Sequence, residues 1–190
     1  MHTPDAFSEA LLHPNAARLY AMIWRESPIS RSDLAVRTGL TKSTVSSHVN
    51  QLIRRGLIEE TDYRPSGSEG GRRARLLGVK AESLVVAGVH VGVRQTRVVL
   101  ADATGRELAV SVTATRRRQP AEAALATSAG TVAGLLDQEE VPRARLSAVG
   151  VVIPGSIDPV TGWCRIAPNL GWREVGVTDI LSNALGVPVY

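Results

Sequence analysis

The sequence predicts two domains of different fold class, an α+β domain over residues 1–80 and an α/β domain over residues 81–190. Apolar residues recur mainly at helical spacing in the first part, whereas valine-rich strand-type runs dominate the second. The first 80 residues contain 12 Lys and Arg against 8 Asp and Glu, and residues 81–190 contain 10 against 10. The whole basic excess therefore lies in one domain, which favours a polyanionic partner for that domain.

The first domain opens with two predicted helices. PNAARLYAMIWRE, residues 14–26, places Leu19, Met22 and Ile23 on one face at i, i+3 and i+4. After SPIS, Ser30 stands where the N-cap of a second, short helix is expected, with an acidic residue three positions later. Gly39 is expected to end that helix, because glycine tolerates the left-handed conformation at a helix C-terminus.

A third predicted helix follows Thr41, its expected N-cap, and reads KSTVSSHVNQLIRRG. Val45, Val49, Leu52 and Ile53 form its buried stripe, and the opposite face carries short polar side chains. Two helices joined by a tight glycine turn are typical of a helix-turn-helix. Short polar residues would let the last helix enter a major groove. A helical hairpin with a serine-rich surface is the alternative.

A basic β-hairpin is predicted next, in GLIEETDYRPSGSEGGRRARLLGVKA. Its strands lie around Leu57 and Ile58 and over residues 74–79, and a Gly, Ser and Pro tip joins them. A basic hairpin beside a recognition helix can follow the phosphate backbone or enter the minor groove. We therefore expect a winged helix-turn-helix domain that binds a double-stranded DNA operator. The expected DNA contacts are Ser30, Arg31, Thr41, Lys42, Ser43, Thr44, Ser46, Ser47, Asn50, Arg72, Arg73 and Arg75.

The second domain begins with three strand-type runs, LVVAGVHV, TRVVLAD and ELAVSVTAT. A helix is predicted over residues 119–140, and a strand over residues 145–155 that is apolar enough to be central and covered on both faces. Residues 156–172 are expected to form a loop, residues 178–186 a helix and VPVY a last short strand. This order resembles part of the first lobe of the actin-like, or ribonuclease H-like, ATPase and sugar-kinase fold.

Several motifs in this order resemble the ROK family of repressors, open reading frames and sugar kinases. They are the wing end GRRARLLGV, the turn after GVHVG, and AVGVVIPGSIDPVTG followed by PNLGW, and the resemblance covers essentially the whole chain. It implies a cytoplasmic homodimer or higher homo-oligomer that binds a sugar or sugar phosphate. With a winged helix, it implies a transcriptional regulator of carbohydrate use, in particular a repressor. It also implies that Gly155 and Asn169 contact the sugar, while ordinary loop chemistry is the alternative for both residues.

The alternative activity is that of an ATP-dependent ROK sugar kinase with an appended DNA-binding domain. In the kinase members, the sequence of the first hairpin resembles D-x-G-G-T. This chain has His90, Val91, Gly92, Val93 and Arg94 at that place. A histidine cannot replace a carboxylate beside Mg²⁺, which prefers oxygen ligands. The chain also ends at Tyr190, before the Asn-Asp pair whose Asp is the family's catalytic base. We therefore expect an incomplete lobe with no catalytic, cofactor or metal site; a non-functional or autoinhibitory fragment is a third hypothesis.

Composition supports a cytoplasmic protein without a membrane partner. No apolar run approaches the roughly 18 residues of a membrane span, and the N-terminus lacks a basic leader followed by a long apolar segment. The single cysteine, Cys164, excludes an internal disulfide and a cysteine-based zinc site. The basic run at 116–118 is expected to be a solvated cluster, with a secondary DNA contact as the alternative.

Overall fold

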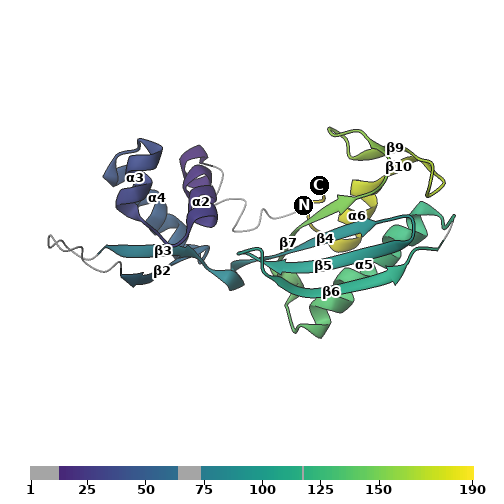
Figure 1. The fold of residues 1–190 in the computed structure, drawn as a ribbon, viewed down its shortest axis with the longest axis horizontal. Helices are drawn as coiled ribbons and strands as arrows, with labels where there is room; N and C mark the ends of the chain where they lie inside the picture. Colours follow the sequence, from purple (N-terminus) through teal and green to yellow (C-terminus); the bar gives the residue numbers. More distant parts are fainter. Residues whose placement is uncertain (1–12, 64–73, 117) are drawn as a thin grey trace. The chain divides into compact units, whose positions relative to one another are not determined.

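The computed structural model describes residues 13–63, 74–116 and 118–190. Its chain divides into two compact units, Met1–Ser83 and Leu84–Tyr190 (Figure 1). Among the described residues, no helix is both long and apolar enough to cross a membrane.

The first unit combines helices with a small antiparallel sheet whose strand order is β1-β3-β2. Its elements are α2 (Pro14–Glu26), β1 (Ile29–Ser30), α3 (Arg31–Thr38), α4 (Lys42–Arg54), β2 (Ile58–Tyr63), β3 (Arg75–Val79) and the 3₁₀ turn η1 (Ala81–Ser83). The apolar stripes of the helices meet in one core with the sheet, as their spacing predicts. Its most deeply buried side chains include Leu19, Ile23, Leu34, Val45, Val49, Leu52, Ile58 and Leu77.

Local signals set the ends of these helices, and the predicted caps are confirmed. Ser30 and Asp33 form a reciprocal capping box at the start of α3. Gly39 ends α3 with a φ of 71°, in the left-handed region that glycine adopts without strain. The side chain of Thr41 accepts a hydrogen bond from the backbone N–H of Thr44 and so caps α4.

The predicted wing hairpin is confirmed in its paired strands. Ile58 lies opposite Val79 and Tyr63 lies opposite Arg75, with an irregularity in the register between Glu60 and Tyr63. Residues 64–73, which include the predicted hairpin tip and the predicted DNA contacts Arg72 and Arg73, lie outside the described residues.

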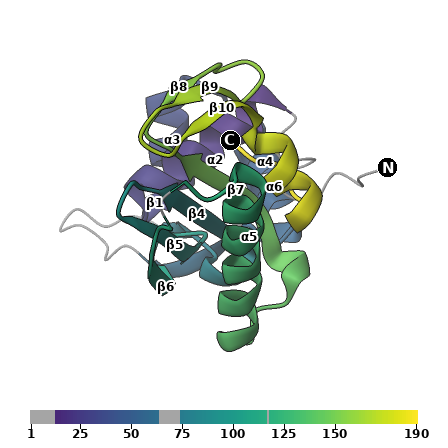
Figure 2. The ribbon, with the colours of Figure 1, turned by 90° about the vertical axis from the view of Figure 1, so that its right-hand side faces the viewer.

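The second unit is built on a sheet with strand order β6-β5-β4-β7, in which only the β4–β7 pairing is parallel. Its strands are β4 (Val85–Val91), β5 (Gln95–Asp102), β6 (Glu107–Ala114) and β7 (Leu146–Val152). The long helix α5 (Ala121–Gln138), the 3₁₀ turn η2 (Arg143–Arg145) and the helix α6 (Val177–Leu185) complete this layer. Figures 1 and 2 show α5 and α6 on the same face of the sheet, where one core joins them to the alternate residues Val85, Ala87 and Val89 of β4.

The strand β7 is the last strand in the sheet order, and the prediction that it is central and covered on both faces is wrong. It lies between β4 and residues 188–190, where the Val149 N–H donates to the Pro188 carbonyl at 3.0 Å and the Tyr190 N–H donates to the Val149 carbonyl at 2.9 Å. The expected last strand is only a single bridge between Val149 and Val189. Val152 is 61% exposed, because α5 and α6 cover only the other face of the sheet.

The prediction of a loop over residues 156–172 is also wrong. This segment and the residues after it form β8 (Ser156–Ile157), β9 (Trp163–Ala167) and β10 (Trp172–Gly176), paired in the order β10-β9-β8. The Gly and Pro residues that suggested a loop occupy the turns, where Gly162 and Gly171 have φ of 69° and 76°. Between those turns, Cys164 and Ala167 are completely buried.

Candidate DNA-binding surface and ligand pocket

The helix α4 presents a polar face that matches the predicted recognition surface. Its apolar stripe of Val45, Val49 and Leu52 is buried in the first unit. On the other side, the structure leaves short polar side chains and one lysine accessible. Exposed are Lys42, Ser43, Ser47 and Asn50, and half-buried are Thr44 and Ser46.

Hydroxyl groups gather at the start of α4. The Thr41 Oγ1 accepts from the Thr44 N–H at 3.2 Å and lies 2.8 Å from both the Ser43 Oγ and the Thr44 Oγ1. All of these groups lie beside the positive end of the helix dipole. A phosphate is the ligand that such a helix start suits, since hydroxyl and backbone N–H groups can both donate to it.

Ser30 caps α3 and is buried, so its expected role as a DNA contact is corrected. Its side chain is 1% exposed, its Oγ donates to the Asp33 Oδ2 at 2.8 Å, and it accepts from the Asp33 N–H at 3.2 Å. A hydroxyl that is buried in the cap of α3 is not available to DNA. Ser30 is therefore not part of the candidate DNA-binding surface.

Two predicted DNA contacts, Arg31 and Arg75, meet at one carboxylate that the sequence reasoning missed. The Arg31 Nη2 donates to the Glu60 Oε1 at 2.9 Å, and the Arg75 Nη1 donates to the Glu60 Oε2. The hydrogen bond from Arg75 lowers the pKa of Glu60, the positive charges of both arginines lower it further, and partial burial opposes them. Glu60 is therefore ionised at neutral pH, and the three groups together carry a net charge of about +1.

The first hairpin of the second unit has the turn that the sequence predicts. The Gly92 N–H donates to the Gln95 carbonyl at 3.0 Å. A Cβ at Gly92 would stand 2.7 Å from that carbonyl oxygen, so the turn requires glycine. Val93 and Arg94 are exposed at its tip, and His90 is exposed on the strand before it.

The two predicted sugar contacts lie in separate turns. Gly155 closes a turn in which its N–H donates to the Ile153 carbonyl at 3.0 Å, and a Cβ there would stand 2.6 Å from the Ile166 oxygen. Asn169 is exposed in the turn of residues 167–171. Neither residue lines the pocket that the second unit contains nearby.

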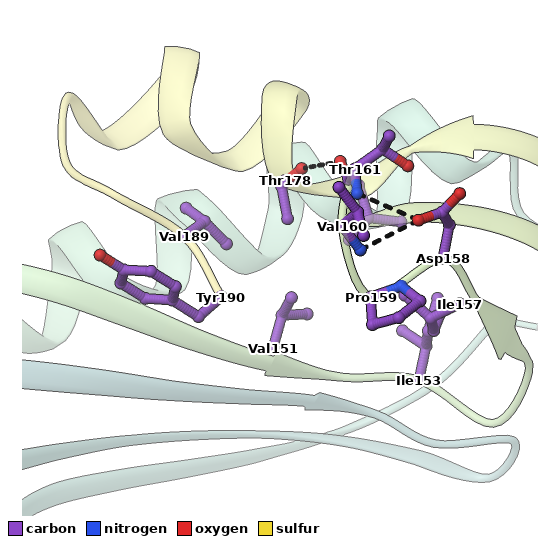
Figure 3. A pocket seen from close by; sticks show the side chains of 12 residues that line it. Val151, Ile153, Ile157, Asp158, Pro159, Val160, Thr161, Thr178, Val189 and Tyr190 are labelled. Atoms are coloured by element: carbon purple, nitrogen blue, oxygen red, sulfur yellow. Dashed lines mark hydrogen bonds between the residues drawn. The ribbon is translucent and has the colours of Figure 1, made fainter.

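That pocket has a volume of about 380 Å³ and opens between β7, residues 157–162, the start of α6 and the segment at Tyr190. Figure 3 shows Val151, Val189 and Tyr190 on one side of it and the turn around Val160 on the other. The Asp158 Oδ1 accepts from the Val160 N–H at 2.9 Å and from the Thr161 N–H at 3.1 Å. The Thr178 Oγ1 donates to the Thr161 carbonyl at 3.3 Å and ties the turn to α6.

The electrostatics of the pocket centre on Asp158. The backbone hydrogen bonds from Thr161 and Val160, and then the bond from Arg165, hold the pKa of this carboxyl below its ordinary value. The carboxylate thus fixes the turn that forms one wall of the pocket. The sequence reasoning missed this pocket because its walls come from segments that only the fold brings together, although the turn motif DPVTG marks one wall.

Comparison with known proteins gives two family matches. A model described as a helix-turn-helix domain matches residues 11–61, and a model described as the ROK family matches residues 86–190. The chain is 35% identical over 175 residues to a transcriptional regulator of Mycobacterium tuberculosis, covering 92% of this chain and 39% of the relative. It is 29% identical over 178 residues to the DNA-binding transcriptional dual regulator NagC of Escherichia coli K12 and to the N-acetylglucosamine repressor of E. coli O157:H7, covering 93% of this chain and 43% of each.

The chain thus spans only about 40% of the length of these curated relatives. A solved structure has the same fold, namely that of a ROK family transcriptional regulator described as a homolog of the E. coli MLC protein. The TM-score is 0.72 at 21% identity, covering 92% of this chain and 44% of that one. With its ROK match over more than half of its length, behind a helix-turn-helix domain, this chain belongs to the ROK family.

Proposed function

We propose that the chain is the DNA-binding part, together with the first portion of the ligand-responsive part, of a sugar-responsive transcriptional regulator that acts on an operator of carbohydrate genes. The observation that supports this most is the exposed polar face of α4 behind its Thr41 cap. Lys42, Ser43 and Ser47 would contact base edges or phosphates in the major groove. Arg31 and Arg75 would contact the phosphate backbone, and Arg72 and Arg73 of the predicted wing would do the same.

The effector that we propose is a sugar or a sugar phosphate bound by the second unit. The similarity to the N-acetylglucosamine repressor supports this class of ligand. Gly155 and Asn169 stay candidates for part of such a site, because their turns are exposed in the same unit. We assign no kinase reaction to this chain, because the turn from His90 to Arg94 offers no carboxylate for a metal-bound nucleotide. A homodimer or higher oligomer is the proposed assembly, since two-fold symmetric proteins match palindromic operators.

Selection of bound duplexes from a random-sequence library tests the proposal, followed by mobility-shift titration of the enriched sequence. Ser47→Glu adds a negative charge on the exposed face of α4. We expect it to weaken binding at least about ten-fold, because the new carboxylate faces DNA phosphates. Repeating the titration with hexoses, N-acetylhexosamines and their phosphates tests the effector class.

Thr127→Glu is the matched control, because Thr127 is exposed on α5 in the second unit and gains the same charge. It should leave DNA affinity within two-fold of that of the unmodified protein, because Thr127 lies outside the candidate DNA-binding surface and salt screens an exposed charge. Failure of the library to yield any enriched sequence would refute the proposed function. Equal affinity of the Ser47→Glu variant would remove α4 from the interface.

A further inference from the structure

Glu60 connects parts of the first unit that are distant in sequence. It lies in β2, whereas Arg31 is the first residue of α3, 29 positions away, and Arg75 is the first residue of β3, 15 positions away. The Glu60 side chain is 24% exposed and those of Arg31 and Arg75 are 30% and 57% exposed. One half-buried carboxylate therefore ties the start of a helix to the base of the wing.

The same carboxylate lines a hollow on the surface of this unit. The hollow has a volume of about 460 Å³, and its walls include Arg31, Asn50, Glu59 and Lys80 besides Glu60. Asn50 comes from the exposed polar face of α4. The recognition helix, the start of α3 and the wing thus contribute to one concave surface with Glu60 in its wall.

A carboxylate that pairs with two arginines in a DNA-facing surface has two physical effects on binding. Long arginine side chains lose rotamer freedom when a ligand orders them, and a residue that orders them beforehand reduces that cost. A carboxylate within a DNA-facing surface also repels phosphates, so DNA that cannot make the matched arginine contacts is disfavoured. The first effect strengthens binding to a matching duplex, and the second weakens binding to every other duplex.

We propose that Glu60 is a positioning residue for DNA recognition, whose carboxylate holds Arg31 and Arg75 in the geometry that a matching duplex requires and disfavours other DNA. This inference rests on the proposed function. It differs from a purely structural role, because it concerns the ratio of matched to unmatched affinity rather than the stability of the fold.

The test compares the dissociation constants of the whole chain for its selected duplex and for a scrambled duplex of equal length and composition. For Glu60→Gln we expect the ratio of the two affinities to fall about ten-fold, as the loss of ordering of two long side chains implies. Glu60→Asp, which keeps the charge, should restore part of the ratio. Glu26→Gln is the matched control, because Glu26 is exposed at the end of α2, pairs with Arg37 and loses the same charge outside the hollow.

A second measurement separates positioning from folding. If Glu60 acts through the two arginines, Glu60→Gln should change the ratio by less than two-fold when Arg31→Gln and Arg75→Gln are already present, as expected for coupled residues. An unchanged ratio in the single Glu60→Gln variant overturns the inference, and so does an equal fall in Glu26→Gln. If the unmodified chain selects no duplex, the proposed function fails together with this inference. If it selects a duplex and the Glu60→Gln variant has the same ratio of matched to unmatched affinity as the unmodified chain, only the inference fails.

Discussion

At the scale of single residues, Asp102 shows how a buried carboxylate stays ionised. It is 4% exposed at the end of β5, and it accepts from the Thr104 N–H at 2.9 Å, the Thr104 Oγ1 at 2.6 Å and the Arg106 Nε at 3.0 Å. Burial raises the pKa of this carboxyl, but the hydrogen bonds from Thr104 and Arg106 outweigh burial and the pKa is lowered overall. These bonds close the turn between β5 and β6.

Asp102→Asn should lower the free energy of unfolding at neutral pH by about 1–3 kcal/mol, because charge-assisted hydrogen bonds are lost in a buried place. The ordinary pKa of 3.8 is higher than that of the folded state, so the stabilising contribution is complete above the ordinary value. It disappears as the pH falls through the folded-state pKa. Urea unfolding at a series of pH values should therefore show the two proteins converging below about pH 4.

Asp137→Asn provides the comparison, because Asp137 is 64% exposed and pairs with Arg143 only at the surface. Its effect should stay below about 1 kcal/mol at every pH, as is usual for exposed ion pairs. A stability difference for Asp102→Asn that does not change with pH would contradict the role given to its charge.

At the scale of helices and strands, the sequence correctly predicted the features that depend on residues close together in the chain. The ends of α3 and the start of α4 lie where the sequence predicted them, at Ser30, Gly39 and Thr41, because capping depends on residues within one turn. The short strands β8, β9 and β10 were missed, because the Gly and Pro residues of the turns between them are also typical of an irregular loop. The exposed face of β7 was missed for a related reason, since an apolar run does not tell which face the helices will cover.

Gly155 tests the packing of the turn after β7 against β9. A Cβ at this residue would stand 2.6 Å from the Ile166 oxygen and 2.9 Å from the Ala167 Cβ, so Gly155→Ala must displace β9. We expect a loss of about 1–3 kcal/mol in the free energy of unfolding, the usual size of an overpacking defect. Faster amide hydrogen exchange in residues 163–167 should accompany it.

Gly150→Ala is the matched control, because nothing lies within 4 Å of a Cβ built at this position in β7. It should change stability by less than about 0.5 kcal/mol, as most surface substitutions do. If both alanine variants were equally stable, the close approach of the Gly155 turn to β9 would not be a constraint on this unit.

At the scale of the whole molecule, charge distribution was the most informative sequence property for the proposed partner. The basic excess in residues 1–80 could be counted directly, and it pointed to the same unit as the helix-turn-helix match. Glu60 and the pocket beside Asp158 could not be found in this way, because each depends on segments that only tertiary structure brings together. Sequence patterns thus predicted the elements of the candidate DNA-binding surface, but not the ion pairs that Glu60 makes with its arginines.

The same charge distribution predicts how DNA binding depends on salt. Arg31, Arg75 and Glu60 together carry a net charge of about +1, and Lys42 adds one more. If these two charges each neutralise one phosphate, the logarithm of the association constant should fall against the logarithm of salt concentration with a slope of about −2 or steeper. Fluorescence anisotropy titrations of a labelled duplex between about 50 and 300 mM KCl measure this slope. Lys42→Ala should make it less steep by about one, since one counterion fewer is released.

Arg143→Ala removes the same charge from the second unit and should leave the slope unchanged, because Arg143 lies outside the candidate surface and already pairs with Asp137. A slope near zero would mean that phosphate contacts contribute little, and the basic residues of the first unit would then be ordinary solvated surface. A steep slope that only Lys42→Ala reduces would instead locate the polyanion contact at the start of α4, where the hydroxyls of Thr41, Ser43 and Thr44 already gather.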